Sequence, residues 1–151
     1  MTVGRANENW CDEVEDLYKD KISKLIPFEL IHLKGSRYPR SQAVEKRKAD
    51  SDIILKHLKK DDIVILCDEK GQELDTLKAA KKIKQLQQAT SARLVVVLGG
   101  PFGVTKEVMD RAHWKWSLSS LTFSHLVAVA VVLEQLYRVA TIWKNIPYHN
   151  A

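Results

Sequence analysis

The sequence has few of the features that mark exported, metal-binding or membrane-spanning chains. Its only cysteines, Cys11 and Cys67, form no paired spacing, which favours reduced thiols over a disulfide or a zinc site. The longest unbroken apolar run covers residues 126–133, far short of the roughly 20 residues that a membrane-spanning helix needs. No basic segment precedes an apolar one at the N-terminus, so no export signal is expected. We therefore expect a cytoplasmic protein with no membrane or metal partner.

Glycine and proline are also scarce, and no strong charge of one sign is present. Six glycines and four prolines with 45% hydrophobic residues exclude disordered and collagen-like chains, and 151 residues fit one domain covering residues 1–151. The net charge is +5, a mild excess that favours polyanionic partners without proving one. Basic residues gather in segments 34–48, 56–60 and 78–84. Any one cluster taken alone is most simply a solvated helix face, because acidic residues are interspersed.

Apolar residues follow helix-like and strand-like spacings in turn. Helices are predicted over residues 10–25, 41–58, from Asp75 or Thr76 through 86, from Thr105 onward, and over 126–144. Buried strands are predicted over residues 63–67, leaving into a turn at 68–71, and 94–98, whereas 28–33 alternates only partly. Strands that alternate with helices predict an α/β fold, with a mostly parallel sheet flanked by helices. The last helix is apolar nearly all round in its first half, so it should be buried on more than one side, in the core or also against a second subunit.

A glycine-rich turn at residues 99–103 follows the best strand and precedes a helix. Open α/β sheets place ligands at this kind of position, and glycines let a ligand approach main-chain groups closely. The spacing fits neither a dinucleotide fingerprint nor a Walker A loop, since no Lys-Ser/Thr pair follows. By itself the turn is a weak signal, and a tight structural turn explains it equally well.

Two further polar groups are candidates for chemistry. The hydroxyl-rich stretch 117–122 is most simply an edge strand or a loop. Near the C-terminus the candidates for substrate work are His125, Arg138, Tyr148 and His149. Each also has a structural explanation, as a helix start, an ion-paired side chain or a frayed tail. No Ser/His/Asp order, nucleophile elbow or HExxH pattern is present, which argues against hydrolases and metalloenzymes.

Taken together, four ordered motifs resemble one family. They occupy residues 98–104 (LGGPFGV), 116–125 (WSLSSLTFSH), 133–138 (LEQLYR) and 147–149 (PYH), with further support at 3–5 and 66–71. This set resembles the ribosomal large subunit pseudouridine N3-methyltransferases of the SPOUT, or α/β-knot, class, and the likeness spans nearly the whole chain. The resemblance implies a homodimer whose C-terminal segment forms a trefoil knot. It also implies S-adenosyl-L-methionine as cofactor, held by Cys67, Gly99, Gly100, Leu118, Ser119, Ser120, Leu121, Thr122 and Phe123.

The substrate that the resemblance implies is a pseudouridine in the helix 69 loop of 23S rRNA, presented by the assembled ribosome. Arg138, Tyr148 and His149 would bind or orient the nucleotide, and His149 or His125 would accept the N3 proton. The chain departs from the family pattern in a short first strand, in Ser124 where Pro is common, and in Val129 where most members carry Arg. Two alternatives stay open, a non-catalytic RNA- or ribosome-binding module on the same fold and a SPOUT methyltransferase that acts on transfer RNA.

Overall fold

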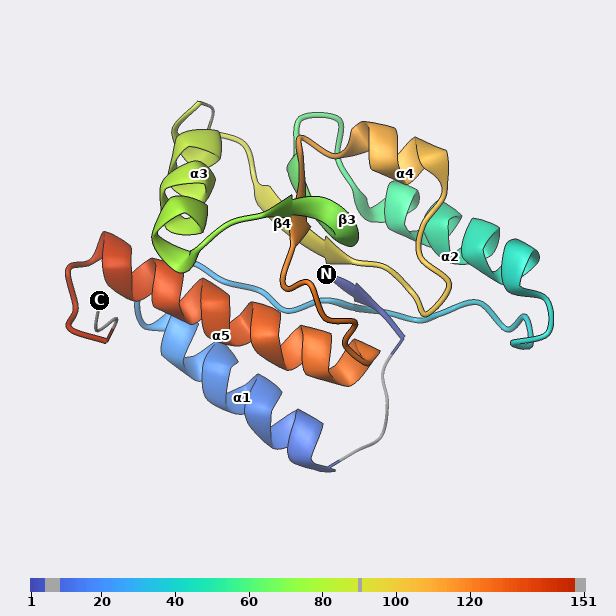
Figure 1. Cartoon of the computed structure of the whole chain (residues 1–151), viewed down its shortest axis with the longest axis horizontal. Coiled ribbons are helices and arrows are strands. Elements are labelled where there is room, and N and C mark those ends of the chain that lie inside the picture. Colours follow the sequence, from blue (N-terminus) through green and yellow to red (C-terminus); the bar gives the residue numbers. More distant parts are fainter. Residues whose placement is uncertain (5–8, 90, 149–151) are drawn as a thin grey trace.

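The computed structural model describes residues 1–4, 9–89 and 91–148, and within them one five-stranded sheet lies between helices (Figure 1). Its strands lie in the order β2-β1-β4-β3-β5, and every neighbouring pair is parallel. The predicted α/β fold with a mostly parallel sheet is therefore confirmed. The strands are β1 (Thr2–Val3), β2 (His32–Leu33), β3 (Ile63–Glu73), β4 (Leu94–Leu98) and β5 (Trp114–Ser117).

Each helix of the described chain falls in a segment for which the sequence predicts one. Of the two candidate caps for the third helix, Asp75 fills the role, since its Oδ1 accepts a 2.8 Å hydrogen bond from the backbone N of Lys78. Figure 1 shows α1 and α5 lying along each other on one side of the sheet, with α2 and α4 together on another side. The helices are α1 (Asn9–Ser23), α2 (Ala43–His57), α3 (Thr76–Gln88), α4 (Lys106–Arg111) and α5 (His125–Trp143).

Two apolar cores lie on opposite faces of the sheet. Ile65 and Val96 belong to the core beneath α1, α3 and α5, whereas Val64 and Val97 belong to the core beneath α2 and α4. Because successive strand residues point to opposite faces, a strand that is apolar at every position needs cover on both sides. The helices on both faces of the sheet therefore account for the unbroken apolar run of β4.

The strand β3 is longer than the sequence predicts. Residues 68–71 were expected to be a turn that ends it, and this prediction is wrong, because pairing resumes between Gln72 and Trp116 after a register shift. Gly71 permits the return, since a Cβ there would lie 2.7 Å from the backbone carbonyl of Lys115. Residues 68–71 therefore stay within β3, and the register of its pairing with β5 shifts across them.

Smaller parts of the sheet also differ from expectation. In the segment 28–33, only residues 32–33 form a strand. In the stretch 117–122, Ser117 ends the edge strand β5 and residues 118–122 are a loop, so each of the two alternatives holds for part of it. The first strand is as short as the sequence suggested, yet it pairs with both β2 and β4. The threading of the C-terminal segment into a trefoil knot stays a prediction.

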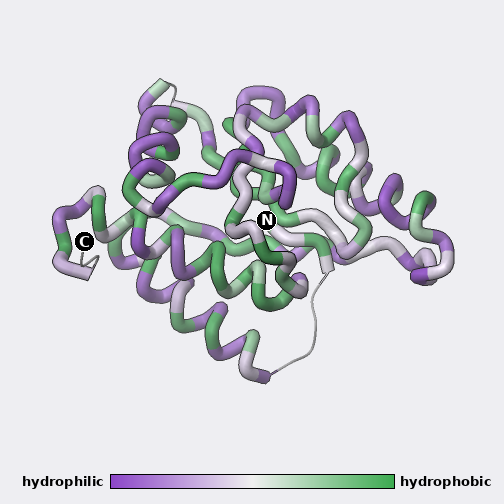
Figure 2. The backbone as a smooth tube through the Cα atoms, viewed as in Figure 1, coloured by the Kyte–Doolittle hydropathy of each residue, from purple (hydrophilic) through white to green (hydrophobic). Residues whose placement is uncertain are grey.

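The helix α5 is partly buried and strongly apolar (Figure 2). By length and composition it could cross a membrane, but here it packs against α1 and α3 as a core helix. Five apolar residues are buried along it, yet only 33% of its 18-residue apolar window is buried in the single chain. Most of its other residues are partly buried, and Val127 is the one exposed residue of the helix, at 40%. The packing of α5 against a second subunit stays a prediction. The buried apolar residues are Val129, Val132, Leu133, Val139 and Ala140.

Candidate functional site

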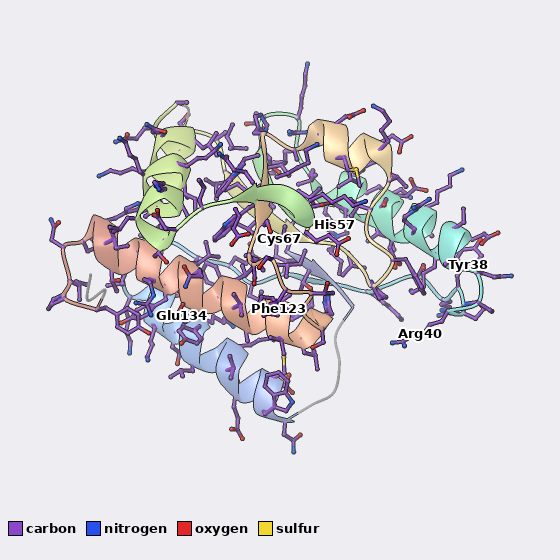
Figure 3. All side chains as sticks on the ribbon, viewed as in Figure 1. Tyr38, Arg40, His57, Cys67, Phe123 and Glu134 are labelled. Atoms are coloured by element: carbon purple, nitrogen blue, oxygen red, sulfur yellow. The ribbon has the colours of Figure 1, made fainter. Side chains whose placement is uncertain are left out.

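A cavity of about 580 Å³ opens where the parallel strands end. Its walls come from the turn 99–103 after β4, from residues 67–70 of β3, from the loop 118–123 after β5 and from the start of α5. Figure 3 labels Cys67 and Phe123, which line the cavity from two of these segments. Open α/β sheets bind ligands at the carboxyl ends of their strands, and this volume lies within the usual range for small-molecule sites.

The fold brings together most of the residues that the resemblance assigns to the cofactor. Burial raises the pKa of the Cys67 thiol to about 12, although the nearby N-terminal ammonium group lowers it. The thiol is therefore protonated and forms a small apolar wall instead of a reactive thiolate. Ser120 is the exception, because it does not line the cavity and its side chain is exposed. The eight that line it are Cys67, Gly99, Gly100, Leu118, Ser119, Leu121, Thr122 and Phe123.

The glycine turn rests on two buried polar side chains of α2. A Cβ on Gly100 would lie 2.9 Å from Oδ2 of Asp50, so only glycine allows the turn to approach this carboxylate so closely. Asp50 is 2% exposed, and its Oδ1 accepts a 2.6 Å hydrogen bond from the backbone N of Ser36. Ser51 is also buried, and its Oγ accepts a 2.9 Å hydrogen bond from the backbone N of Thr105, the N-cap of α4. The helix α2 thus supports the turn at Gly100, through Asp50, and just after it at Thr105, through Ser51.

Asp50 and Ser51 were not predicted to belong to the site, although the sequence contains a signal for them. Asp50 and Ser51 stand four and three residues before the buried Ile54, on the face that helical spacing directs to the core. Polar residues at core-facing positions need buried hydrogen-bond partners, which here are supplied by the turn and its neighbours. The cavity is also lined by residues that were not predicted as site residues, including Arg47, Asp68, Glu69, Lys70, Phe102 and Met109.

His125 lies at the wall of the cavity, at the start of α5. Its Nε2 is 2.8 Å from Oγ1 of Thr2, so one ring nitrogen is engaged with the central strand β1. Burial lowers the pKa of His125, the charge of His32 lowers it further, and Glu15 raises it. The imidazole is therefore neutral near pH 7. Among the residues that the structure describes, no group of three or more His, Cys, Asp or Glu side chains is placed to hold a metal ion.

Two of the other predicted substrate residues, Arg138 and Tyr148, lie at the opposite end of α5. The Nε of Arg138 donates a 3.0 Å hydrogen bond to Oε1 of Glu134, and the hydroxyl of Tyr148 donates a 3.3 Å bond to the same oxygen. The guanidinium carbon of Arg138 lies 4.7 Å from the centre of the Tyr148 ring. The structure thus brings Arg138 and Tyr148 together around one carboxylate, whereas His149 lies outside the described residues.

Neither Arg138 nor Tyr148 lines the cavity of the same chain. Arg138 follows His125 by thirteen positions, which corresponds to about 20 Å along a helix that rises 1.5 Å per residue. Figure 3 labels Phe123, just before the start of α5, and Glu134, farther along the helix. The predicted cofactor residues and His125 are therefore near one end of α5, and Arg138 and Tyr148 are near the other.

A second cavity of about 540 Å³ lies between the segment 26–31, β4 and α5. Its walls are mainly apolar, and none of the predicted cofactor or substrate residues lines it. We therefore assign the chemistry to the cavity at the glycine turn.

Two departures from the family pattern have local explanations. Val129, where most members carry Arg, is 3% exposed and packs in the core beneath α5. Ser124, where Pro is common, is the N-cap of α5, and its Oγ accepts a 3.5 Å hydrogen bond from the backbone N of Val127. Both residues therefore suit their positions in this fold.

Comparison with known proteins agrees with the family that the motifs resemble. A family model described as "Predicted SPOUT methyltransferase" matches residues 1–149. The Ribosomal RNA large subunit methyltransferase H of Bdellovibrio bacteriovorus is 46% identical over 148 residues, 98% of this chain and 95% of that protein. Proteins of the same name from Parabacteroides distasonis and Trichlorobacter lovleyi are 34% and 31% identical; they cover 99% and 98% of this chain, and the matches span 96% and 95% of their own lengths. This chain belongs to the SPOUT methyltransferase family.

Proposed function

We propose that this protein is a cytoplasmic, S-adenosyl-L-methionine-dependent methyltransferase that methylates N3 of a pseudouridine in the helix 69 loop of 23S rRNA, within the assembled ribosome. The observation that carries the proposal is the cavity at the glycine turn, because segments far apart in the sequence meet there as the family motifs require. The family match over residues 1–149 and the names of the full-length relatives support ribosomal RNA as the substrate.

The cavity suits a cofactor that is part polar and part apolar. Gly99 and Gly100 leave main-chain groups open to close approach, and the loop 118–123 adds hydroxyl groups beside apolar side chains. Such a wall can bury an aromatic ring and donate hydrogen bonds to a sugar. S-adenosyl-L-methionine would supply a methyl group that is already activated on a sulfonium sulfur. The protein then has to align the nucleotide, exclude water and accept the N3 proton.

We propose that the active enzyme is a homodimer in which the two residue groups of α5 meet across the interface. Large apolar side chains are exposed on the paired helices α1 and α5, with Trp10 44%, Leu17 49% and Val127 40% exposed. Trp10 and Leu17 are seven positions apart and so lie on the same side of α1. A second copy packed on this apolar face would bury it. An antiparallel arrangement would bring Arg138 and Tyr148 of one protomer toward the cavity of the other.

We assign proton acceptance to His149, because Nε2 of His125 is already engaged with Thr2. Substituting His149 by Ala should lower methylation while leaving the affinity for S-adenosyl-L-methionine nearly unchanged. Single-turnover methylation and calorimetric titration of the cofactor measure these two properties separately. Unchanged methylation would remove His149 from the mechanism and leave His125 as the remaining candidate.

The function is tested by incubating purified protein and methyl-labelled S-adenosyl-L-methionine with intact ribosomes, separated subunits and transfer RNA. We expect label in the large-subunit RNA of intact ribosomes, on one pseudouridine that mass spectrometry can identify. Label in transfer RNA alone would contradict the proposed substrate and favour the second SPOUT alternative. A protein that binds ribosomes but gains no thermal stability from the cofactor would be a non-catalytic binding module.

A further inference from the structure

The segment 34–48 is the largest of the three basic clusters of the chain. Residues 34–48 contain six basic residues and one acidic residue, a net charge of +5, which equals the value for all 151 residues. The remaining 18 basic and 18 acidic residues cancel. The remainder of the chain is neutral on balance, although residues 78–84 hold four lysines of their own. Charge gathered in one place raises the local concentration of a polyanion far more than the same charge spread over the surface.

Most of this charge is exposed and free of acidic partners. Lys46 is the exception, because its Nζ pairs with Asp50 at 3.2 Å and donates to the backbone O of Ser36 at 3.1 Å. The other five cations are exposed and make no ion pair in the part of the chain that the structure describes. Tyr38 stands among them and is 47% exposed. We call these exposed side chains the basic arm: Lys34, Arg37, Tyr38, Arg40, Arg47 and Lys48.

The arm is held in a defined place beside the cavity. It begins at the carboxyl end of β2, at the same edge of the parallel sheet as the glycine turn, and continues into the first part of α2. Asp50 ties the backbone N of Ser36 to α2, and the same carboxylate lies under Gly100. Arg47 is both a member of the arm and a wall residue of the cavity. Figure 3 shows Tyr38 and Arg40 at the outer end of this region, beyond the start of α2.

The lysines of α3 provide a contrast. Lys78 pairs with Asp75 at 2.8 Å, and Nζ of Lys82 donates to Gln72 and lies over the ring of Trp114. This cluster is therefore partly neutralised or used within the fold, and none of its residues lines the cavity. A second copy of this chain is also a poor occupant of the arm, since two surfaces of the same charge repel each other.

We propose that the basic arm binds the phosphate backbone of ribosomal RNA beside the target nucleotide. Arginines and lysines neutralise phosphates, and an exposed tyrosine offers a surface on which an unpaired base can stack. The arm borders the cavity, so RNA bound there would run directly past the methyl-transfer position. This inference rests on the proposed function and adds to it the surface that holds the substrate.

The test compares two pairs of exposed cations in the full-length protein. Arg37→Ala/Arg40→Ala should raise KM for ribosomes at least about tenfold, leave kcat and cofactor affinity nearly unchanged, and reduce the slope of log affinity against log salt by about 2. The matched control, Lys81→Ala/Lys84→Ala, removes the same charge from α3 and should change none of these quantities. The same quantities are then compared between two charge-reversed pairs, Arg37→Glu/Arg40→Glu in the arm and Lys81→Glu/Lys84→Glu in α3. Ribosome co-sedimentation measures binding without requiring turnover.

The outcomes separate this inference from the proposed function. If the arm pair and the α3 pair give equal KM values and equal salt slopes on ribosomes that the wild type methylates, the arm proposal is wrong and the function stands. If the wild type transfers no methyl group, the function is wrong, and co-sedimentation of the same variants still decides whether the arm binds RNA. Weaker cofactor binding in the arm pair alone would also contradict the proposal, because the arm is assigned to RNA.

Discussion

Replacing Gly100 by alanine is expected to weaken the binding of S-adenosyl-L-methionine at least about tenfold. The new Cβ would overlap Oδ2 of Asp50 at 2.9 Å. That carboxylate has little room to move, because it is buried and is held by the backbone N of Ser36 and by Lys46. Overpacking of this kind costs about 1–3 kcal/mol, and the turn would be displaced into the cavity. Calorimetric titration of the cofactor measures the loss.

The matched control is Gly35→Ala, which adds the same methyl group next to the same carboxylate. A Cβ on Gly35 would lie 3.8 Å from Oδ1 of Asp50, an ordinary contact. Cofactor affinity should therefore stay at the wild-type value in this variant. Equal affinities for the two alanine variants would show that the turn at Gly100 does not form the cofactor site.

Replacing Arg138 by alanine is expected to reduce methylation of ribosomes by about a hundredfold, with cofactor affinity unchanged. Arg138 contacts Glu134 and Tyr148 at the end of α5 that is distant from the cavity. Its removal should therefore disturb the bound nucleotide but not the methyl donor. The rate of a single turnover at saturating cofactor measures the effect.

A mixed dimer tests whether Arg138 acts on the cavity of the partner protomer. One protomer carries Arg138→Ala and the other carries Gly100→Val, which extends the overlap described for alanine. If the site is shared, the mixed dimer has one intact combination of cavity and Arg138 and should recover about half of the wild-type activity. If both groups act within one chain, the mixed dimer should be no more active than the average of its two parents. Separate affinity tags on the two protomers allow the mixed dimer to be purified.

The strands and helices could be predicted because their signals are local. The valine run of β4 and the spacing of α5 specify a buried strand and a long helix, whatever surrounds them. The end of β3 could not be predicted, because its polar residues 68–71 have the composition of a turn. Whether the chain turns away there depends on β5, which lies more than forty residues later and provides the partner for Gln72. Gly71 signalled a turn in the sequence, but in the structure it permits this close return.

In the candidate site, too, some residues could be predicted from the sequence, whereas others depend on contacts between distant parts of the chain. The order of the motifs was sufficient to assign the family and to select eight residues that line one cavity. The role of Asp50 and Ser51 could not be assigned, because the glycine turn that they support lies about fifty residues away in the sequence. The sequence also named His125 and Arg138 as one group of candidates, whereas the rigid length of α5 places them at opposite ends.

By itself, the sequence determined the fold class, the family and the residue types available for binding a methyl donor, since these follow from local periodicity and ordered motifs. Only the tertiary structure decided which residues meet. Parallel pairing collects the strand ends at one edge, and α2 fixes the glycine turn from beneath. Contacts of this kind join residues that are distant in the chain, and local propensity carries no information about such distances.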